Sequence, residues 1–233
     1  MALRPIVPCV YRVRTGASSA YVIDDEELTL VDTGVPGSED RLLGAVRALG
    51  RRPEEVRHIL VTHCHPDHAG SLAALRRATG AATYMHPLDA GMVARGKSMR
   101  VVQRTPGIVP RVLNAWTRRG HQPEIEPVAV EHEVLGGDRL PAAGGMLAIH
   151  APGHTTGQLA FLWPHHGGVL FAGDAAAHVF ALGLSIVYEN QEEGERTLAR
   201  LGTMDFDVAC FGHGRPYVGG ASAAFARRWP TRR

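Results

Sequence analysis

A short segment of the chain concentrates side chains that bind metal ions. Within the run LVTHCHPDHAGS, His63, His65, Asp67 and His68 occupy four of six consecutive positions. In an extended chain alternate side chains point the same way, so His63 and His65 can hold one metal from one side. The chain must turn at Pro66, after which Asp67 and His68 can face a neighbouring position. Imidazole and carboxylate are ligands suited to Zn²⁺, Fe or Mn²⁺.

Three more candidate ligands lie far along the chain, each at the end of a hydrophobic run. They are His154 in APGHTTG, Asp174 in FAGDA and His213 in FGHGRP. Burying so many polar groups without a ligand would be costly, so the pattern favours metal binding. One ion needs two histidines and one further ligand. Four clustered candidates and three distant ones therefore indicate two ions.

Other side chains of the same types lack this pattern. Cys64 lies inside the motif, but the alternation of an extended chain turns its thiol away from His63 and His65, so we expect it to pack in the core. We interpret the isolated histidines as hydrogen-bonded or solvated side chains: His58, His121, His132, His165 and His166.

The elements that position the motif can be read from the first half of the chain. Short β-branched or alternating runs predict strands at 10–14, 19–24, 27–32, 57–63 and 81–86. Leucines at helical spacing predict helices at 41–50, capped by Ser38, and at 69–80. The motif thus lies where a buried strand ends and a helix begins, a place where layered α/β proteins gather functional groups.

The second half repeats this arrangement. Strands are expected at 146–152, 158–164, 167–174 and 207–214, and a helix at 192–202. Two β-rich halves, each with helices, predict an α/β protein of one domain over 1–233. The architecture we expect is a four-layer α/β/β/α sandwich rather than a doubly wound parallel sheet.

Composition describes an ordinary globular chain. Its 233 residues, 45% of them hydrophobic, suffice for one large domain. Three widely spaced cysteines form no disulfide framework and fit a reducing compartment. No run approaches the roughly 20 apolar residues of a membrane span, and the first residues do not read as a signal peptide. We therefore expect a soluble cytoplasmic protein without an integral membrane segment.

The motifs together resemble those of the metallo-β-lactamase superfamily, particularly its glyoxalase II-like hydrolases. The resemblance covers nearly the whole chain. Its parts follow the family's order: Asp32 in LVDTG, the HCHPDH segment, Gly153-His154-Thr155, Gly173-Asp174 and Gly212-His213-Gly214. The resemblance implies an αββα sandwich with the metals at one edge, between the sheets.

The same resemblance implies a role for each candidate. Asp32 would support the metal loop without ligating. The metal ligands would be His63, His65 and His154 for the first ion, Asp67, His68 and His213 for the second, and Asp174 as the bridge. The two divalent ions would be zinc in the first place, with iron or manganese as alternatives.

The implied activity is hydrolysis of a small-molecule ester, thioester or lactone through a metal-bridging hydroxide. Asp67 would be the catalytic proton shuttle. A hydroxyl of Thr155 or Thr156 would orient a ligand, unless these residues serve only the turn.

Departures from the relatives narrow the substrate. Asp174 stands where true β-lactamases of the superfamily usually lack an aspartate. The segment DAAAHVFALGL and a chain that ends soon after Trp229 differ from the glutathione-binding parts of glyoxalase II. Ala177 occupies a position where lactonases often place a tyrosine. The long substrate-handling domains of nucleic-acid-processing relatives are missing, so we expect no nucleic-acid partner.

Two other functions stay open. One is a mononuclear iron oxygenase of the persulfide dioxygenase type, since Fe²⁺ accepts two histidines and one carboxylate. The other is a binding protein that kept the fold without catalysis.

Residues 88–124 form a basic and apolar insertion. The segment has one acid near its start, Asp89, and is split by Pro106 and Pro110 into expected short helices. It could be a helical lid whose arginines attract an anion, a contact in a homodimer, or a weaker membrane-surface element. Its basic residues are Arg95, Lys97, Arg100, Arg104, Arg111, Arg118 and Arg119.

Overall fold

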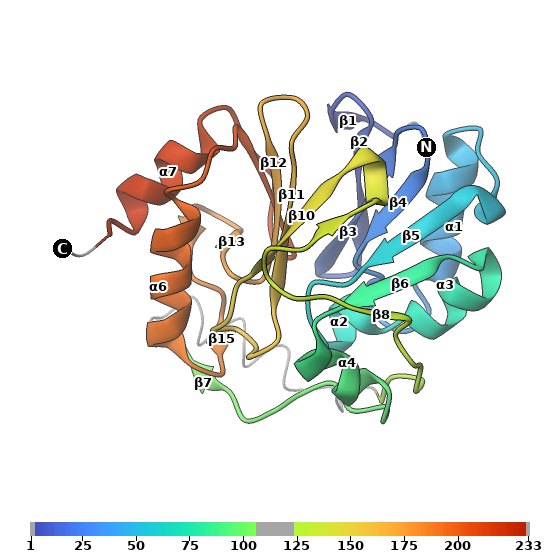
Figure 1. The fold of residues 1–233 in the computed structure, drawn as a ribbon, viewed down its shortest axis with the longest axis horizontal. Helices are drawn as coiled ribbons and strands as arrows, with labels where there is room; N and C mark the ends of the chain where they lie inside the picture. Colours follow the sequence, from blue (N-terminus) through green and yellow to red (C-terminus); the bar gives the residue numbers. More distant parts are fainter. Residues whose placement is uncertain (1–2, 106–123, 232–233) are drawn as a thin grey trace.

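The computed structural model describes residues 3–105 and 124–231. Within them, a sheet of seven strands has the order β1-β2-β3-β4-β5-β6-β8, and one of six has the order β17-β16-β12-β11-β10-β9 (Figure 1). The first sheet comprises β1 (Pro5–Val7), β2 (Val10–Thr15), β3 (Ser18–Asp24), β4 (Leu28–Val31), β5 (Val56–Leu60), β6 (Ala82–Met85) and β8 (His132–Glu133). The second comprises β9 (Arg139–Leu140), β10 (Met146–His150), β11 (Leu159–Trp163), β12 (Val169–Gly173), β16 (Val208–Phe211) and β17 (Tyr217–Val218).

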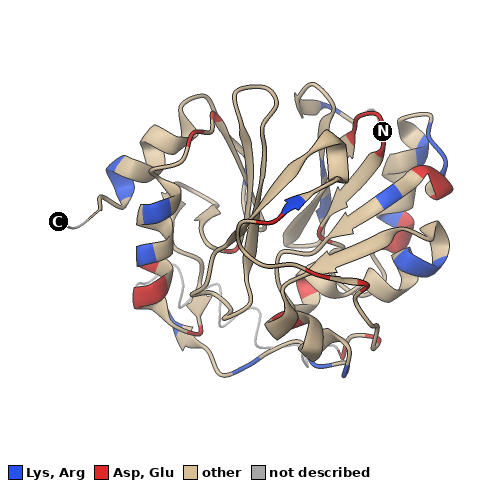
Figure 2. Ribbon diagram, in the orientation of Figure 1, with Lys and Arg blue, Asp and Glu red and all other residues tan. Residues whose placement is uncertain are grey.

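Helices cover the outer faces of both sheets (Figure 1). Those in the first half are α1 (Glu39–Ala48), α2 (Pro66–Ala69), α3 (Leu72–Thr79) and α4 (Pro87–Val93), with a 3₁₀ turn at Pro53–Glu55. Those in the second half are α6 (Gln191–Leu201) and α7 (Ala221–Arg228), with a 3₁₀ turn at Ala142–Gly144. Both acidic and basic residues occur along α6 (Figure 2).

The alternation of side chains along the strands builds three apolar layers. In β3, Ala20 and Val22 pack toward α1 and α3, whereas Tyr21 and Ile23 face the second sheet. A central layer between the sheets includes Leu60, Phe161 and Phe171. A third layer, with Phe206 and Phe225, lies between the second sheet and helices α6 and α7. Three layers of contact require four layers of structure, which confirms the predicted αββα sandwich.

Strand direction brings the candidate ligands to one edge. β4, β5 and β6 run parallel, and Asp32 and the HCHPDH segment follow the ends of β4 and β5. In the second sheet β10 and β12 are both antiparallel to β11, and β16 is parallel to β12. The three strands that precede His154, Asp174 and His213 therefore end at the same edge.

Helix boundaries differ from the sequence prediction at several points. Ser38 is at the N-cap of α1, but its side chain makes no capping bond, and its backbone N–H donates to Ser71 Oγ at 2.8 Å. The single helix expected at 69–80 is instead α2 followed by α3, which ends at Gly80 with a φ of 68°. Helix α7 was not predicted.

The basic insertion is described only in part. It begins with α4, and β7 (Gln103–Arg104) pairs antiparallel with β15 (Val187–Tyr188). Outside the insertion, a second two-stranded sheet pairs β13 (Ala177–His178) with β14 (Leu182–Gly183). The expected helices around Pro106 and Pro110, with Arg111, Arg118 and Arg119, fall outside the described residues, as does His121. Among the helices that the structure does describe, we find none with the length and apolar character of a membrane span.

Candidate metal centre

The HCHPDH segment lies at the end of a buried strand. β5 ends at Leu60, and the chain continues through Val61 and Thr62, all three fully buried, to His63. α2 begins at Pro66, directly after His65, and carries Asp67 and His68 on its short turn. A proline suits the first position of a helix because its missing N–H would have no partner there.

The first group of candidate ligands joins the two halves of the chain. His63, His65 and His154 each offer a ligand atom, and these atoms lie within 4.8 Å of one another. His154 Nε2 is 2.9 Å from His65 Nδ1. All three side chains are buried. Their converging nitrogens form one face of a site that a single cation could occupy.

A second group lies beside the first and is more open to solvent. Asp67, His68 and His213 also offer atoms within 4.8 Å of one another. His213 Nε2 is 3.1 Å from Asp67 Oδ2. The side chain of Asp67 is 31% exposed and that of His213 is 24% exposed, whereas His68 is fully buried. A substrate could therefore approach from the side of Asp67 and His213.

Asp174 lies between the two groups. Its Oδ2 is 3.6 Å from His154 Nε2 in the first group and 3.3 Å from His213 Nε2 in the second. Its Oδ1 is 3.4 Å from His68 Nε2. One buried carboxylate thus faces ligand atoms of both groups, the arrangement that a bridge between two cations requires.

Hydrogen bonds fix the orientation of four imidazole rings through the nitrogen that faces away from the cluster. His63 Nδ1 is 3.0 Å from Thr62 Oγ1, and His68 Nδ1 is 2.8 Å from Asp32 Oδ2. His154 Nδ1 bonds the carbonyl of Val187, and His213 Nδ1 that of Ala17. Donation from Nδ1 leaves Nε2 unprotonated and facing inward, as metal-binding histidines require.

Unpaired buried atoms support the interpretation of a metal site. Nε2 of His63, His65 and His68 and Oδ1 of Asp174 are buried without a hydrogen-bond partner among the described residues. A buried polar atom without a partner costs free energy comparable to a lost hydrogen bond. The clustering of these atoms, all of ligand type, fits residues that hold divalent cations.

The two groups differ in protonation. Burial lowers the pKa of His63 and His154 and lowers that of His65 to about 3, so this group consists of neutral imidazoles. Burial also acts to lower the pKa of His68, but Asp67, Asp32 and Asp174 outweigh it and raise the pKa to about 9. Without a cation His68 is therefore protonated and paired with these carboxylates, and a bound cation would replace the proton on its Nε2.

The loop that carries His213 can pack against Asp174 and His68 only because residue 212 is glycine. A Cβ at Gly212 would collide with Asp174 Oδ1 and with the ring of His68. The backbone of the loop is held by a bond from Gly212 N–H to the carbonyl of Gly173, 2.9 Å long. Close packing of backbone against side chains thus brings the second half of the site into place.

The structure brings all seven candidate side chains into one cluster. A third set of neighbouring ligand atoms, from His63, His68 and Asp174, shares His63 with the first group and His68 with the second. Asp32 accepts hydrogen bonds from Thr62 and His68, which is the supporting position expected of it. Cys64 is buried, with its thiol toward the carbonyl of Ser98. Among the histidines interpreted as ordinary, His58 bonds Tyr84 and Glu27, away from the cluster.

Several residues near the cluster were not predicted from the sequence. Asp89 and Glu189 accept hydrogen bonds from Thr155 and Thr156, so these threonines contact protein carboxylates. Ser185 Oγ donates to Asp174 Oδ2 at 3.2 Å. Arg100, expected as a guide for anions, instead pairs with Asp89 and Glu189. These contacts could not be predicted from residue spacing, because the partners lie on segments that come together only in the folded chain.

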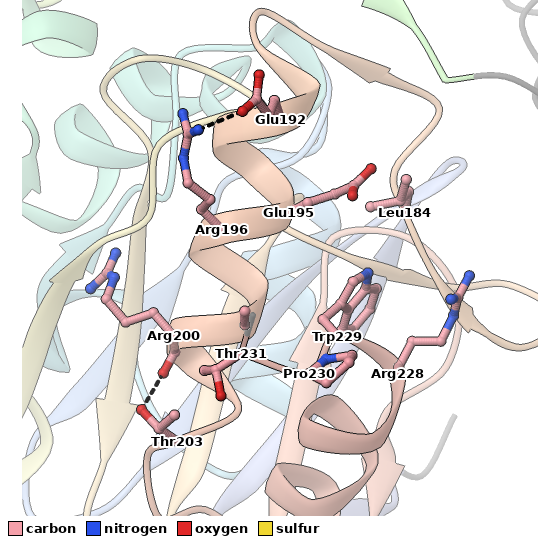
Figure 3. A pocket seen from close by; sticks show the side chains of 11 residues that line it. Leu184, Glu192, Glu195, Arg196, Arg200, Thr203, Arg228, Trp229, Pro230 and Thr231 are labelled. Atoms are coloured by element: carbon pink, nitrogen blue, oxygen red, sulfur yellow. Dashed lines mark hydrogen bonds and ion pairs between the residues drawn. The ribbon is translucent and has the colours of Figure 1, made fainter. Parts of the chain in front are cut away.

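A separate hollow lies on the outer side of α6. One wall is formed by the helix, and the other by the segment around Trp229 (Figure 3). Its charged walls include Glu192, Arg196 and Arg200. The candidate ligands do not line it, so it is not part of the metal centre.

Comparison with known proteins identifies related sequences. A sequence model of the metallo-beta-lactamase superfamily matches residues 13–213. The uncharacterised protein YobT of Bacillus subtilis (strain 168) is 34% identical over 163 residues, which are 67% of this chain and 61% of YobT. A hydroxyacylglutathione hydrolase of Albidiferax ferrireducens is 29% identical over 187 residues, 79% of this chain and 55% of that protein. The chain thus spans less than two thirds of either relative's length.

Solved structures share the fold. The subclass B3 metallo-beta-lactamase of Bradyrhizobium japonicum aligns with a TM-score of 0.71 at 22% identity, over 98% of this chain and 90% of that chain. A beta-lactamase from Chitinophaga pinensis aligns with a TM-score of 0.71 at 20% identity, over 98% of this chain and 91% of that chain. At these identities the likeness concerns architecture alone.

Proposed function

Because the chain belongs to the metallo-beta-lactamase superfamily, we propose that it is a metal-dependent hydrolase with a binuclear centre. Its substrate would be a small-molecule ester, thioester or lactone. The observation that carries this proposal is the position of Asp174, whose carboxylate faces both groups of candidate ligands.

The geometry supports the ligand assignment that the resemblance implies. His63, His65 and His154 would hold the first cation, and the second would be held by Asp67, His68 and His213. Asp174 would contribute to both. The ligand set of nitrogen and oxygen atoms fits zinc, and also iron or manganese.

When bound, two divalent cations supply an acidified water and polarise the oxygen of the group under attack. The chain's own part is to position and to move protons. Asp67 Oδ2 faces His213 Nε2 at 3.1 Å and His68 Nε2 at 3.7 Å. Its other oxygen would take up a proton and pass it to the leaving group, at the more exposed side of the centre.

The relatives support hydrolysis but leave the substrate open. Several curated relatives are named hydroxyacylglutathione hydrolases, including those of Albidiferax ferrireducens and Pseudomonas aeruginosa. This supports an acyl compound as substrate class. The mononuclear iron oxygenase considered from the sequence needs one metal, and the complete second group with His213 favours two. We also propose a cytoplasmic location, with which the three free cysteines agree.

The test is a panel of esters, thioesters and lactones with the zinc-reconstituted chain. We expect hydrolysis of at least one class, its loss on chelation and its recovery on adding zinc. Asp174→Asn should abolish this activity, whereas the matched control Asp205→Asn, which changes an exposed carboxylate, should not. A zinc-loaded chain that hydrolyses none of the three classes would contradict the proposal.

A further inference from the structure

The first group of ligands depends on a contact between distant loops. His65 and His154 lie 89 positions apart in sequence, yet their nitrogens are 2.9 Å apart. His63 and His65 follow a strand of the first sheet, and His154 follows a strand of the second. Some interaction must hold these two loops in register before a cation can bind with fixed geometry.

Asp89 contacts both loops from a fully buried position in α4. Its Oδ2 accepts hydrogen bonds from the backbone N–H of Cys64 at 3.1 Å and from Thr155 Oγ1 at 2.7 Å. Cys64 lies between His63 and His65, and Thr155 is the neighbour of His154. One carboxylate oxygen thus joins the two loops directly.

Arg100 extends this contact to a second carboxylate. Its Nη1 donates to Asp89 Oδ1 at 2.8 Å and to Glu189 Oε1 at 3.1 Å, and its Nη2 donates to the carbonyl of Leu88. Two carboxylates with low exposure would repel each other in the absence of the guanidinium. A planar group with several donors can bind both, which the point charge of lysine cannot match.

Glu189 completes the connection to the loop of His154. Its Oε2 accepts hydrogen bonds from the N–H of Thr156 at 2.9 Å and from the Thr156 hydroxyl. Its own backbone N–H donates to the carbonyl of His154 at 3.1 Å. The segments pack so closely that a Cβ at Gly157 would lie 2.5 Å from Asp89 Oδ1.

We propose that Asp89, Arg100 and Glu189 form a clamp, a set of positioning residues that aligns His63 and His65 with His154. The clamp rests on the proposed function, because its purpose is the geometry of the first cation. The second group is held differently: Asp32 orients His68, and the carbonyl of Ala17 orients His213. Loss of the clamp should therefore weaken the first cation site more than the second.

Isosteric variants test the clamp with little change in volume. In Asp89 and in Glu189 both carboxylate oxygens accept hydrogen bonds. An asparagine or glutamine in either place would therefore turn its NH₂ group toward one of these donors and lose that hydrogen bond. The variants are Asp89→Asn, Glu189→Gln, Arg100→Met and Arg100→Lys. The matched control is Glu126→Gln, which removes the same charge from an exposed pair with Arg77.

Two measurements report on the first site without using turnover. Each variant is made in a His213→Ala background, in which the second group lacks a ligand. The dissociation constant for Zn²⁺ is measured by competition with a chromophoric chelator, and the visible absorption of bound Co²⁺ reports the ligand geometry. We expect the dissociation constant to rise roughly 10–100-fold in Asp89→Asn, Glu189→Gln and Arg100→Met, with an altered Co²⁺ spectrum. Arg100→Lys should recover part of the affinity, and Glu126→Gln should match its parent.

Unchanged metal binding in the variants would rule out the clamp. If the three clamp variants keep the parent affinity and Co²⁺ spectrum, the residues are not positioning residues, even if the melting temperature falls. A wild-type chain that binds metal without hydrolysing any ester, thioester or lactone would contradict the proposed function while the clamp is still decided by affinity. A wild-type chain that binds neither Zn²⁺ nor Co²⁺ would overturn both.

Discussion

At the scale of single residues, the candidate centre depends on both nitrogens of four imidazole rings. Nε2 faces the cluster, and Nδ1 is held by a hydrogen bond on the other side of the ring. A histidine becomes a well-oriented ligand when its second nitrogen is held, and the holders here are Thr62, Asp32 and two backbone carbonyls. Asp32 is the most connected of them, since it accepts bonds from Thr62 and from His68. Its backbone has a φ of 62°, a strained conformation for a residue with a side chain.

The first prediction concerns Asp32. Replacing it with asparagine retains the shape but sets an amide against either Thr62 or His68, which loosens the ring of His68. We expect the affinity for the second cation to fall roughly 10–100-fold, with a smaller effect on the first. Isothermal titration calorimetry with stepwise addition of Zn²⁺ measures both affinities. Equal loss at the two sites would argue against a role specific to His68.

At the scale of elements, parallel strands gather the ligands and close-packed loops complete the site. The loop after β16 approaches Asp174 and His68 because Gly212 has no side chain. The local motif could be predicted because its residues adjoin one another on a single strand end. The main strands could be predicted because their apolar residues alternate or form buried runs.

Other elements could not be predicted, for physical reasons. Two-residue strands such as β7 and β15 exist only through their pairing with each other, and the segments carry no local pattern. The pairing of Arg100 with Glu189 joins residues 89 positions apart, so spacing gives no indication of it. In these two cases a tertiary contact decides the local structure. Ser38 lies at the N-cap as predicted, but its φ of −87° and ψ of −7° are helical and its side chain makes no capping bond.

The second prediction concerns Gly212. Alanine at this position must displace Asp174 or His68, so we expect loss of hydrolytic activity by at least roughly tenfold and weaker binding of the second cation. Metal content and activity of purified Gly212→Ala measure this. The matched control is Gly44→Ala in α1, where a Cβ meets no atom within 4 Å. That control should keep full activity and gain about 0.5–1 kcal/mol in the free energy of unfolding. Full activity in Gly212→Ala would contradict the described approach of the loop.

At the scale of the whole molecule, the candidate ligands are held where the two sheets pack against each other. The apolar layer between the sheets contains large buried side chains, among them Phe161, Phe171 and Trp163. The candidate ligands lie at an edge of the same two sheets and come from both. Bound cations would therefore add to the cohesion that the central layer supplies.

The third prediction follows from that shared role. Removing the cations with a chelator should lower the free energy of unfolding by about 2.7 kcal/mol for each site at which free metal had been at 100 times the dissociation constant. For a chain of this size that corresponds to a melting temperature lower by roughly 5–11 °C per site. Thermal unfolding with and without chelator measures it, and added Zn²⁺ should restore the original value. An unchanged melting temperature would indicate that the ligands are held independently of metal.

The central claim is that two cations bind, one in each group, with Asp174 between them. The most direct test is the number of Zn²⁺ ions per chain, measured by native mass spectrometry on wild type, His154→Ala and His213→Ala. We expect two ions in the wild type and one in each variant, because each substitution removes a ligand from a different site. One ion in the wild-type chain, or the loss of both ions in either variant, would contradict two separate sites.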